Sequence, residues 1–541
     1  MTRSSSTGSR DMTQKEEAVG LCAIEWTGGT GDWQGICRDI LAGTGMDVFK
    51  KGSVLRAWYP DRVRPASRSK LRYADGWKLV RTWLGQGRCA ISVLPSRIYF
   101  ESDSNTPSAR PERELLNGSR GPERGRARSL LTGCLELCDR LAHAEKGLGG
   151  IVQLNPLGND VVNGSRRWVG GTSGPLDTSV HSLHGRFGYD RVPALVRAAI
   201  VPVRTFDNNA AGKFRETLDR ECKKRRVALI SKVVPPEYLS DRLTPERVRD
   251  GAVVVLIFPE PGLHPPEGLR LMKALEELGM PFRRAYATDN LKWSVPGQLG
   301  SIVEAAGGIP FRLEVPGLPD NLWSLGVDMS HRVKGRLTWL SVSLVDPTGR
   351  LVRAWRGRQL LDERAAPNLL KHILVEAGEM ARESCPDPKF LVLRDGRFLD
   401  GEESNGFDLH LGAPASVVEV RKGSNPQIWT GKGRDLPAAE SWSFLSTRGH
   451  VVFCCPNPYP KQGGSGRVLK LTWKKEEDRL GLGREGIVRA VLAGRYGSAL
   501  GTHVPTLPAS LYWADGIAGA SDEDLRFRGQ PVINVSVPPG G

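Results

Sequence analysis

Two aspartates at strand-like positions constrain the fold of this chain most strongly. Asp328 interrupts one apolar run, and Asp395 ends another. Between them, residues 337–345 and 351–360 predict a hairpin, because an Asp-Pro-Thr-Gly turn separates them. Apolar residues at helical spacing then predict a helix from Pro367 to Ser384. The order is therefore a strand with Asp, a hairpin, a loop, a helix and a second strand with Asp.

Two further acidic residues complete the pattern. Glu363 lies in the loop between hairpin and helix, and Asp515 lies at the start of a short helical pattern. A single acid among 60 is most often a solvated surface charge, so the hypothesis depends on the order and context of all four. Mg²⁺ takes oxygen ligands, and two ions about 3.5–4 Å apart can hold the attacking and leaving oxygens of a phosphodiester. The four carboxylates predict a two-metal nuclease site.

Seven fragments between residues 307 and 535 resemble, in order, the PIWI domain of prokaryotic Argonautes. They are Gly307–Phe311, Gly326–Asp328, Glu363, Arg394–Gly396, Val420–Lys422, Gly466–Lys470, and Leu507–Pro508 with Ala514–Asp515. The resemblance implies an RNase H-like nuclease domain over residues 313–541, with Asp328, Glu363, Asp395 and Asp515 as its catalytic tetrad. It also implies that Asp328, Asp395 and Asp515 bind two Mg²⁺ or Mn²⁺ ions, and that Glu363 is a mobile "glutamate finger".

Residues 191–312 alternate between strand-like and helix-like segments. Apolar β-branched runs cover 194–203 and 252–258, and helical patterns cover 213–226 and 266–279. This alternation predicts a Rossmann-like parallel sheet covered by helices, which suits the Argonaute MID domain that grips the 5′ end of a guide strand. Free N–H groups at helix N-termini favour phosphate. The candidate guide-binding residues are Arg270, Lys273, Arg283, Lys292 and Gln298.

Two features leave the guide-binding pocket open to interpretation. Arg270 and Lys273 also fit an ordinary solvated helix face. Ala305 stands where many relatives have a lysine that contacts phosphate. The sequence therefore leaves open whether the guide carries a 5′-phosphate or a 5′-hydroxyl, and whether an arginine compensates.

The N-terminal part is shorter than in full-length relatives. Residues 1–17 are polar and predict a disordered tail, and residues 18–190 predict a smaller α+β linker-like region. At about 100 residues per domain this region is too short for N-terminal, PAZ and linker domains together, so we expect PAZ to be absent. Residues 104–128 carry six arginines and predict a mobile basic loop, either a disordered linker or a nucleic-acid contact.

Composition agrees with a nucleic-acid partner. The formal charge of +16 and pI near 9.5 favour a polyanion, although basic charge also occurs in proteins that merely stay soluble. No run of 18 apolar residues is present, so we expect no membrane partner. Nine scattered cysteines predict reduced thiols and a cytoplasmic location. The pairs Cys134/Cys138 and Cys454/Cys455 are interpreted as structural rather than metal-binding.

Together these observations predict a guide-directed endonuclease, acting in defence against invading DNA. A short guide DNA or RNA would select a complementary single-stranded target by base pairing, with its backbone along a basic channel that includes Arg421, Lys422 and Lys470. The alternative is a guided sensor that does not cut its target but activates an accessory effector protein. Short Argonautes without PAZ commonly resemble such sensors. The filled tetrad favours the enzyme. An unguided RNase H-like nuclease is disfavoured by the MID-like segment.

Overall fold

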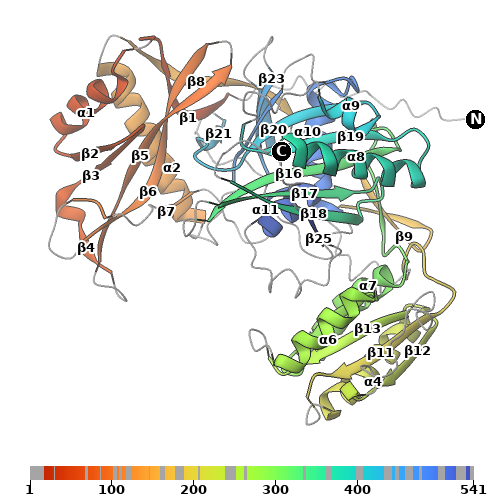
Figure 1. Ribbon diagram of the computed structural model, residues 1–541. Coiled ribbons are helices and arrows are strands. Elements are labelled where there is room, and N and C mark those ends of the chain that lie inside the picture. The colour runs from red at the N-terminus through yellow and green to blue at the C-terminus, as the bar shows by residue number, and fades with distance from the viewer. Residues whose placement is uncertain are drawn as a thin grey trace, which may run out of the picture. The chain divides into compact units, whose positions relative to one another are not determined.

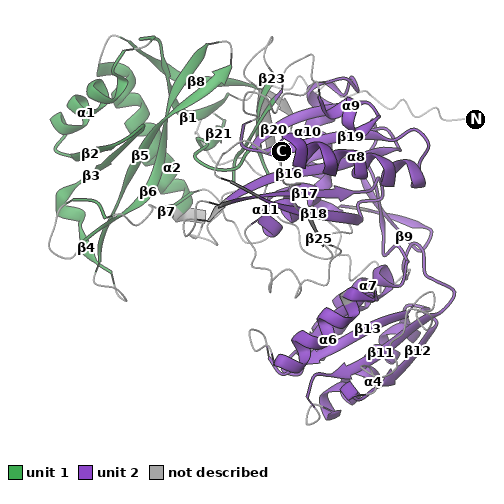
Figure 2. Ribbon diagram, in the orientation of Figure 1, with its two compact units in different colours: residues 1–160, 421–472 green, residues 161–420, 473–541 purple. Residues whose placement is uncertain are grey.

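The computed structural model describes residues 18–29, 31–66, 71–85, 87–101, 106–108, 113–116, 124–144, 147–158, 165–176, 188–204, 208–237, 252–260, 265–278, 280–332, 337–360, 367–397, 406–431, 441–444, 450–456, 467–473, 478–497, 506–518 and 532–535. The chain forms two compact units (Figure 2). Unit 1 combines residues 1–160 with 421–472, and unit 2 combines 161–420 with 473–541. In the described parts of the chain, no helix is long and apolar enough to cross a membrane.

Unit 1 is built on an antiparallel sheet in the order β2-β3-β5-β6-β1-β8-β22-β23. Figure 1 labels all of these strands except β22. Three short strands pair with ends of its interior strands: β4 with β5, β7 with β6, and β21 with the first residues of β1. The strands are β1 (Val19–Trp26), β2 (Asp47–Lys51), β3 (Val54–Trp58), β4 (Arg64–Pro65), β5 (Arg72–Gly85), β6 (Arg88–Phe100), β7 (Arg113–Glu114), β8 (Leu148–Gly158), β21 (Ile428–Thr430), β22 (Ser441–Phe444), β23 (His450–Cys455) and β24 (Leu469–Trp473), the last belonging to this unit up to Thr472.

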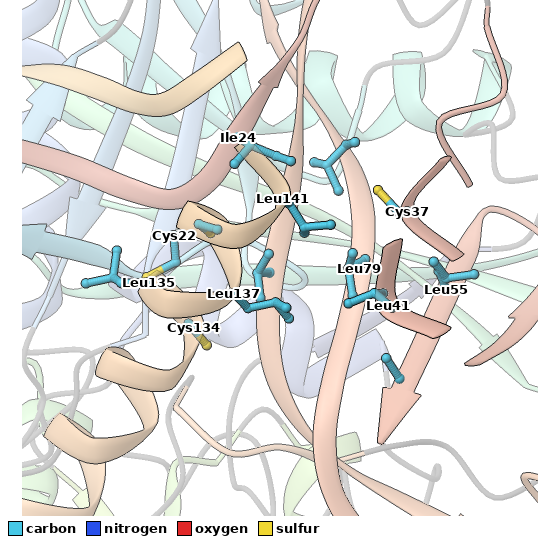
Figure 3. Close-up of a cluster of buried hydrophobic side chains, with 14 of the residues drawn as sticks. Cys22, Ile24, Cys37, Leu41, Leu55, Leu79, Cys134, Leu135, Leu137 and Leu141 are labelled. Carbon is cyan, nitrogen blue, oxygen red and sulfur yellow. The ribbon is translucent and has the colours of Figure 1, made fainter. Parts of the chain in front are cut away.

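Both faces of β1 are buried, which explains its nearly continuous apolar sequence. Cys22 and Ile24 face the helices α1 (Trp33–Gly43) and α2 (Arg124–Ala144), as Figure 3 shows. Leu21 and Ala23 face the opposite way and pack with residues of β21 and β23. A 3-10 helix, η1 (Pro60–Arg62), follows β3. The segment 421–472 therefore supplies part of the core of a unit that begins 400 residues earlier.

Helix α2 corrects one expectation and confirms another. The basic loop predicted over residues 104–128 is too long, because strand β7 occupies 113–114 and α2 begins at Arg124; residues 102–105, 109–112 and 117–123 lie outside the described residues. An apolar stripe buried in the core stabilises the helix from its first turns. Cys134 and Cys138 lie on this stripe, and burial raises the pKa of Cys134 well above its usual range. Both side chains pack in the hydrophobic core, as the structural interpretation of this pair predicts.

The first sheet of unit 2 is parallel, in the order β12-β11-β13-β14 (Figure 1). Alternate residues of β13 explain its two helical layers, because Val253, Val255 and Ile257 pack with α4 and α7, whereas Val254 and Leu256 pack with α6. The predicted parallel sheet covered by helices is confirmed. The elements are β11 (Val196–Pro202), α4 (Asn208–Lys224), β12 (Leu229–Val233), β13 (Ala252–Phe258), α6 (Pro266–Glu277), β14 (Phe282–Tyr286) and α7 (Leu291–Ala305).

The second sheet of unit 2 is mixed, in the order β25-β18-β17-β16-β19-β20. Strand β16 is antiparallel to β17 and parallel to β19. The predicted hairpin, helix and strand are confirmed. The elements are β16 (Leu322–Arg332), β17 (Leu337–Val345), β18 (Leu351–Leu360), α8 (Pro367–Ser384), β19 (Lys389–Asp395), α9 (Phe407–Leu411), β20 (Ala415–Arg421), α10 (Gly483–Ala493), η6 (Gly494–Tyr496), α11 (Ala509–Ala518) and β25 (Val532–Val535).

The two faces of this mixed sheet differ in side-chain size. Leu325 and Val327 of β16, with Leu340 and Val342 of β17, pack against α8. The intervening residues are small or polar and face α11. Unit 2 also contains a third, small sheet in the order β10-β9-β15. Its strands are β9 (Arg166–Val169), β10 (Thr172–Pro175) and β15 (Arg312–Glu314), and β15 lies in the chain between α7 and β16.

Candidate metal centre

Strand register places Asp328 beside Asp395. In the parallel pair β16–β19, Val327 lies opposite Arg394, so the next residue of each strand is an aspartate at the same carboxyl edge of the sheet. Asp328 is 5% exposed and Asp395 is half-buried. Gly396 follows with φ of +86°, a left-handed conformation that favours glycine and turns the chain away directly after the carboxylate.

Asp515 reaches the same place from helix α11. One ligand oxygen from each of Asp328, Asp395 and Asp515 can be chosen so that all three atoms lie within 4.8 Å of one another. From its sequence pattern Asp515 is expected at the start of its helix, but α11 begins at Ala509 and Asp515 lies in its second half. The apolar residues Ala509, Leu511 and Ala514 are buried and extend the helix on the N-terminal side.

A seat of small residues on the sheet lets α11 approach this closely. A Cβ atom added at Gly326 would lie 2.3 Å from the carbonyl carbon and oxygen of Ser510. The helix backbone therefore rests directly on β16, two residues before Asp328. We call the four small residues under α11 its seat: Ser324, Gly326, Ser341 and Ser343. The sequence was not interpreted as predicting this contact, although small residues at alternate positions of apolar strands are its signal.

Hydrogen bonds fix α11 along and across this seat. The Ser341 hydroxyl donates to the carbonyl oxygen of Ala514 at 2.6 Å, directly before Asp515. The Ser343 hydroxyl donates to the carbonyl oxygen of Ser510, and the hydroxyls of Ser324 and Ser510 are 2.7 Å apart. Three side chains of the sheet thus bind the helix at Ser510 and at Ala514, the residue directly before Asp515.

The charges at this edge of the sheet suit a divalent cation. Like charges at short range repel one another, most strongly where a group is buried, as Asp328 is. Carboxylate oxygens are the ligands that Mg²⁺ and Mn²⁺ prefer. Arg356 of β18 supplies a positive charge on the same face of the sheet, two strands from Asp328. It is fully buried, and its guanidinium carbon is 3.7 Å from the centroid of the Trp339 ring. The donor set therefore fits a hard metal ion.

Glu363, the fourth predicted catalytic residue, lies outside the described residues. The structure thus brings together three of the four predicted carboxylates. A cavity of about 540 Å³ lies nearer the amino end of β16; Ser324 and Ser510 line it, but none of the three carboxylates does. The candidate chemistry is at the opposite, carboxyl edge of the strands.

The predicted guide-binding residues lie at several places around the parallel sheet. Arg270 and Lys273 are exposed on α6, where the Lys273 ammonium is 3.7 Å from the Glu277 carboxylate. Lys292 is exposed in the first turn of α7, which covers the other face of the sheet. Both helices follow strands of the parallel sheet, so their N-termini lie at its carboxyl edge, where ligands of such sheets bind.

Arg283 is not grouped with these cations. It is the second residue of β14, about 10 Å before the carboxyl edge at ~3.3 Å per residue. Its guanidinium donates to the carbonyl oxygens of Ser301 at 3.1 Å and Phe282 at 2.9 Å. Burial raises the pKa of Glu304 to about 7, whereas the nearby positive charge of Arg283 acts in the opposite direction. Within the structure Arg283 serves the packing of α7 on β14.

Gln298 has a feature that helix periodicity does not show. Its Oε1 atom and the Ser294 hydroxyl, one turn earlier on α7, are buried and have no hydrogen-bond partner among the described residues. Buried polar atoms of this kind are costly unless a ligand or water satisfies them. The two side chains therefore mark this side of α7 as a place where a polar ligand would be favoured.

The three residues of the predicted basic channel differ in exposure. Arg421 ends β20 and, like Lys422, is half-buried. Lys470 is 4% exposed; its ammonium donates to the carbonyl oxygen of Trp83 and lies 5.2 Å from the centroid of that ring. Such contacts are typical of a lysine that stabilises its own domain, so the channel hypothesis depends on Arg421 and Lys422.

Comparison with solved structures finds Argonaute proteins. Marinitoga piezophila Argonaute in complex with 5′ OH guide RNA and target DNA has a TM-score of 0.62 and 13% identity, covering 91% of this chain and 85% of that one. Kluyveromyces polysporus Argonaute with a guide RNA has a TM-score of 0.61 and 10% identity, covering 91% and 78%. A. aeolicus Argonaute has a TM-score of 0.53 and 12% identity, covering 93% and 96%.

No protein-family model and no curated protein matches the sequence. The likeness is therefore one of structure, and it extends over about nine-tenths of the chain. The resemblance expected from the ordered sequence fragments is confirmed at the level of the fold: the chain has the fold of Argonaute proteins.

Proposed function

We propose that this chain is a guide-directed, metal-dependent endonuclease that binds a short guide strand and cleaves a complementary target strand. The observation that carries the proposal is the convergence of Asp328, Asp395 and Asp515 at one edge of a sheet within an Argonaute fold. A structural neighbour holds guide RNA and target DNA together, which supports a nucleic-acid duplex as the ligand of this fold. We further propose that it acts in the cytoplasm, in defence against invading DNA.

Asp328, Asp395 and Asp515 would hold Mg²⁺ or Mn²⁺. When bound, two such ions activate water and stabilise the leaving 3′ oxygen of a phosphodiester. The protein contributes rigidity, because Asp328 and Asp395 belong to neighbouring strands and Asp515 to a helix bonded to that sheet. Glu363, on the chain between hairpin and helix, is proposed to complete the site.

The parallel-sheet part of unit 2 is proposed to hold the 5′ end of the guide. Lys292 in the first turn of α7 supplies a cation, and the buried, unsatisfied Oε1 atom of Gln298 offers a polar contact on the same helix. Base pairing with the guide then selects the target, so the protein contacts mainly the backbone and the shape of the duplex.

Cleavage of a labelled single-stranded target tests this proposal. Purified protein is mixed with Mn²⁺ and complementary DNA or RNA guides that carry a 5′-phosphate or a 5′-hydroxyl. We expect one cut at a fixed distance from the 5′ end of the guide, abolished by Asp395→Ala. The matched control is Asp387→Ala, an exposed aspartate just before the other end of β19, which should cut like the wild type.

The same assay separates the enzyme from the alternative. Tight guide and target binding by the wild type without any cut would reject the endonuclease and favour a guided sensor that works through a partner effector. A cut that does not depend on a guide would instead indicate an unguided nuclease.

A further inference from the structure

Unit 1 contains a cavity of about 700 Å³ where α2 crosses one end of the sheet. Its lining comes from α2, β5, β6, the segment around η1 and Met46 before β2, all within unit 1. The volume falls in the range of ~300–1,000 Å³ that is typical of small-ligand sites. The three carboxylates of the metal centre belong to unit 2, and none of them lines this cavity.

Small residues keep the cavity open. Gly133 lies in the middle of α2 and lines the cavity, and a Cβ atom built there would be 3.9 Å from the ring of Trp77. Glycine inside a helix costs roughly 1 kcal/mol relative to alanine. Ser129 and Thr132 complete this side of the helix. Gly133 thus leaves space beside Trp77 that a larger side chain would occupy.

The cavity is lined by more positive than negative charge. Arg62, Arg128 and Arg140 face two acids, Asp75 and Glu136. The Asp75 carboxylate is already bound by Arg97, with N–O distances of 2.7 and 3.0 Å. The lining therefore carries three arginines and two acids, and its formal charge is positive. Arg128 and Arg140 are both exposed and are 12 residues apart on α2, or about 18 Å along the helix axis.

Two aromatic rings lie among these arginines. Tyr59 and Trp77 are in edge contact, with ring centroids 5.9 Å apart, and both are half-buried. The Arg62 guanidinium carbon lies 4.7 Å from the centroid of the Tyr59 ring. Rings that accept stacked bases, set among cations that accept phosphates, are the combination by which proteins bind single strands without sequence preference.

We propose that this cavity binds a short stretch of single-stranded nucleic acid, with a base against Trp77 and Tyr59 and phosphates on Arg62, Arg128 and Arg140. The proposal rests on the proposed function in taking the ligand to be nucleic acid, but it does not require cleavage. It assigns to unit 1 a second point of contact for a strand, separate from the metal centre of unit 2.

Photocrosslinking tests the position of the strand. Short oligonucleotides carrying 5-iodouracil at one position each are bound to full-length Asp395→Ala protein in EDTA, irradiated and mapped by mass spectrometry. We expect crosslinks to Trp77 or Tyr59 from a restricted set of positions. Protection by a free nucleoside 5′-monophosphate would show that the site takes a single nucleotide, whereas protection only by unlabelled oligonucleotide would show that it needs a strand.

Variants test the contribution of the cavity to binding. Arg128→Ala combined with Arg140→Ala should weaken strand binding about tenfold or more and lower the log–log salt slope by roughly 0.7 per lost phosphate contact. Gly133→Leu should obstruct the space beside the Trp77 ring and weaken the crosslink strongly, whereas Gly133→Ala should retain it. The matched control is Arg38→Ala, an exposed arginine of α1 outside the cavity, which should bind and crosslink normally.

The outcomes separate the two proposals. Strand binding with crosslinks elsewhere, or with full affinity in the double arginine variant, would overturn the cavity proposal and leave the endonuclease standing. A crosslink to Trp77 in a protein whose wild type never cuts would support the cavity and reject the endonuclease. Absence of any strand binding would overturn both.

Discussion

Substitution of Gly326 by alanine should disable the metal centre without touching a carboxylate. The new Cβ would lie 2.3 Å from the carbonyl carbon and oxygen of Ser510 and 2.6 Å from the nitrogen of Leu511. Non-bonded carbon atoms pack at ~3.5–4.0 Å, so α11 must move away from β16 by roughly 1 Å. Backbone atoms cannot rotate aside as a flexible side chain would. The helix carries Asp515 with it.

Both stability and activity should respond to this shift. Overpacking of this kind costs ~1–3 kcal/mol, and a misplacement of ~1 Å at a catalytic group costs about 100-fold in rate. We would measure guided cleavage, the melting temperature, and the rise in melting temperature on adding Mn²⁺. Cleavage and the Mn²⁺ effect should both fall sharply, while circular dichroism shows a folded protein.

Gly212→Ala is the matched control. Gly212 lies inside α4 with nothing within 4 Å of a built Cβ, so alanine there should raise stability slightly through helix propensity. If Gly326→Ala cuts at the wild-type rate and keeps the full Mn²⁺ effect, the close seat of α11 does not position Asp515, and the reasoning is refuted.

Three further predictions concern the same unit. Ser341→Ala removes the hydroxyl that donates to the carbonyl oxygen of Ala514, so it should lower both cleavage and Mn²⁺ affinity. Ser341→Thr keeps a hydroxyl and should retain part of both. Equal activity in the two variants would contradict a positioning role for Ser341. In the absence of metal, Asp328→Asn should melt at a higher temperature than the wild type, because one of three neighbouring negative charges is lost. Adding Mn²⁺ should raise the melting temperature of this variant little. A lower melting temperature without metal would argue against repulsion among the three carboxylates. Burial raises the pKa of Glu304 from 4.5 to about 7, so the folded protein holds the Glu304 proton more tightly than the unfolded chain does. The contribution of Glu304 to the free energy of unfolding is therefore full below pH 4.5. It falls by up to about 3 kcal/mol as the pH rises from 4.5 to 7. Denaturant titrations of the wild type and Glu304→Gln across this range should show the loss in the wild type alone, and parallel pH profiles would contradict it.

Local patterns predicted the elements of this fold well. The hairpin, the helix from Pro367 to Ser384 and the strand that ends at Asp395 are all found, as is the parallel sheet with its helices. Each is encoded by periodicity and turn residues within a short segment. The order of ordinary fragments was sufficient to indicate the Argonaute fold.

Contacts between distant segments were not predictable in the same way. The seat of α11 joins Gly326 to Ser510, and neither residue has an unusual local sequence. The sequence suggests that Arg283 is a surface cation, whereas in the structure its guanidinium donates to the carbonyl oxygen of Ser301 on α7. Lys470 likewise lies in a basic fragment, but its partner is the backbone of Trp83. Such placements depend on tertiary packing, which outweighs the local pattern of a single sequence.

Unit 1 is assembled from two stretches of chain that are made far apart in time. Strand β1 pairs with β21 through Val19 and Thr430, and the Trp429 indole donates to the carbonyl oxygen of Leu21 at 3.3 Å. During synthesis, the first stretch must wait for about 260 intervening residues before its partner leaves the ribosome. Domains generally fold as units during synthesis; here the continuous parallel-sheet segment can fold while the apolar strand β1 remains uncovered. A single cut at residue 160 or 420 would therefore not yield unit 1 as a stable fragment, and expression of the protein should depend on chaperones that shield β1 until the segment 421–472 arrives.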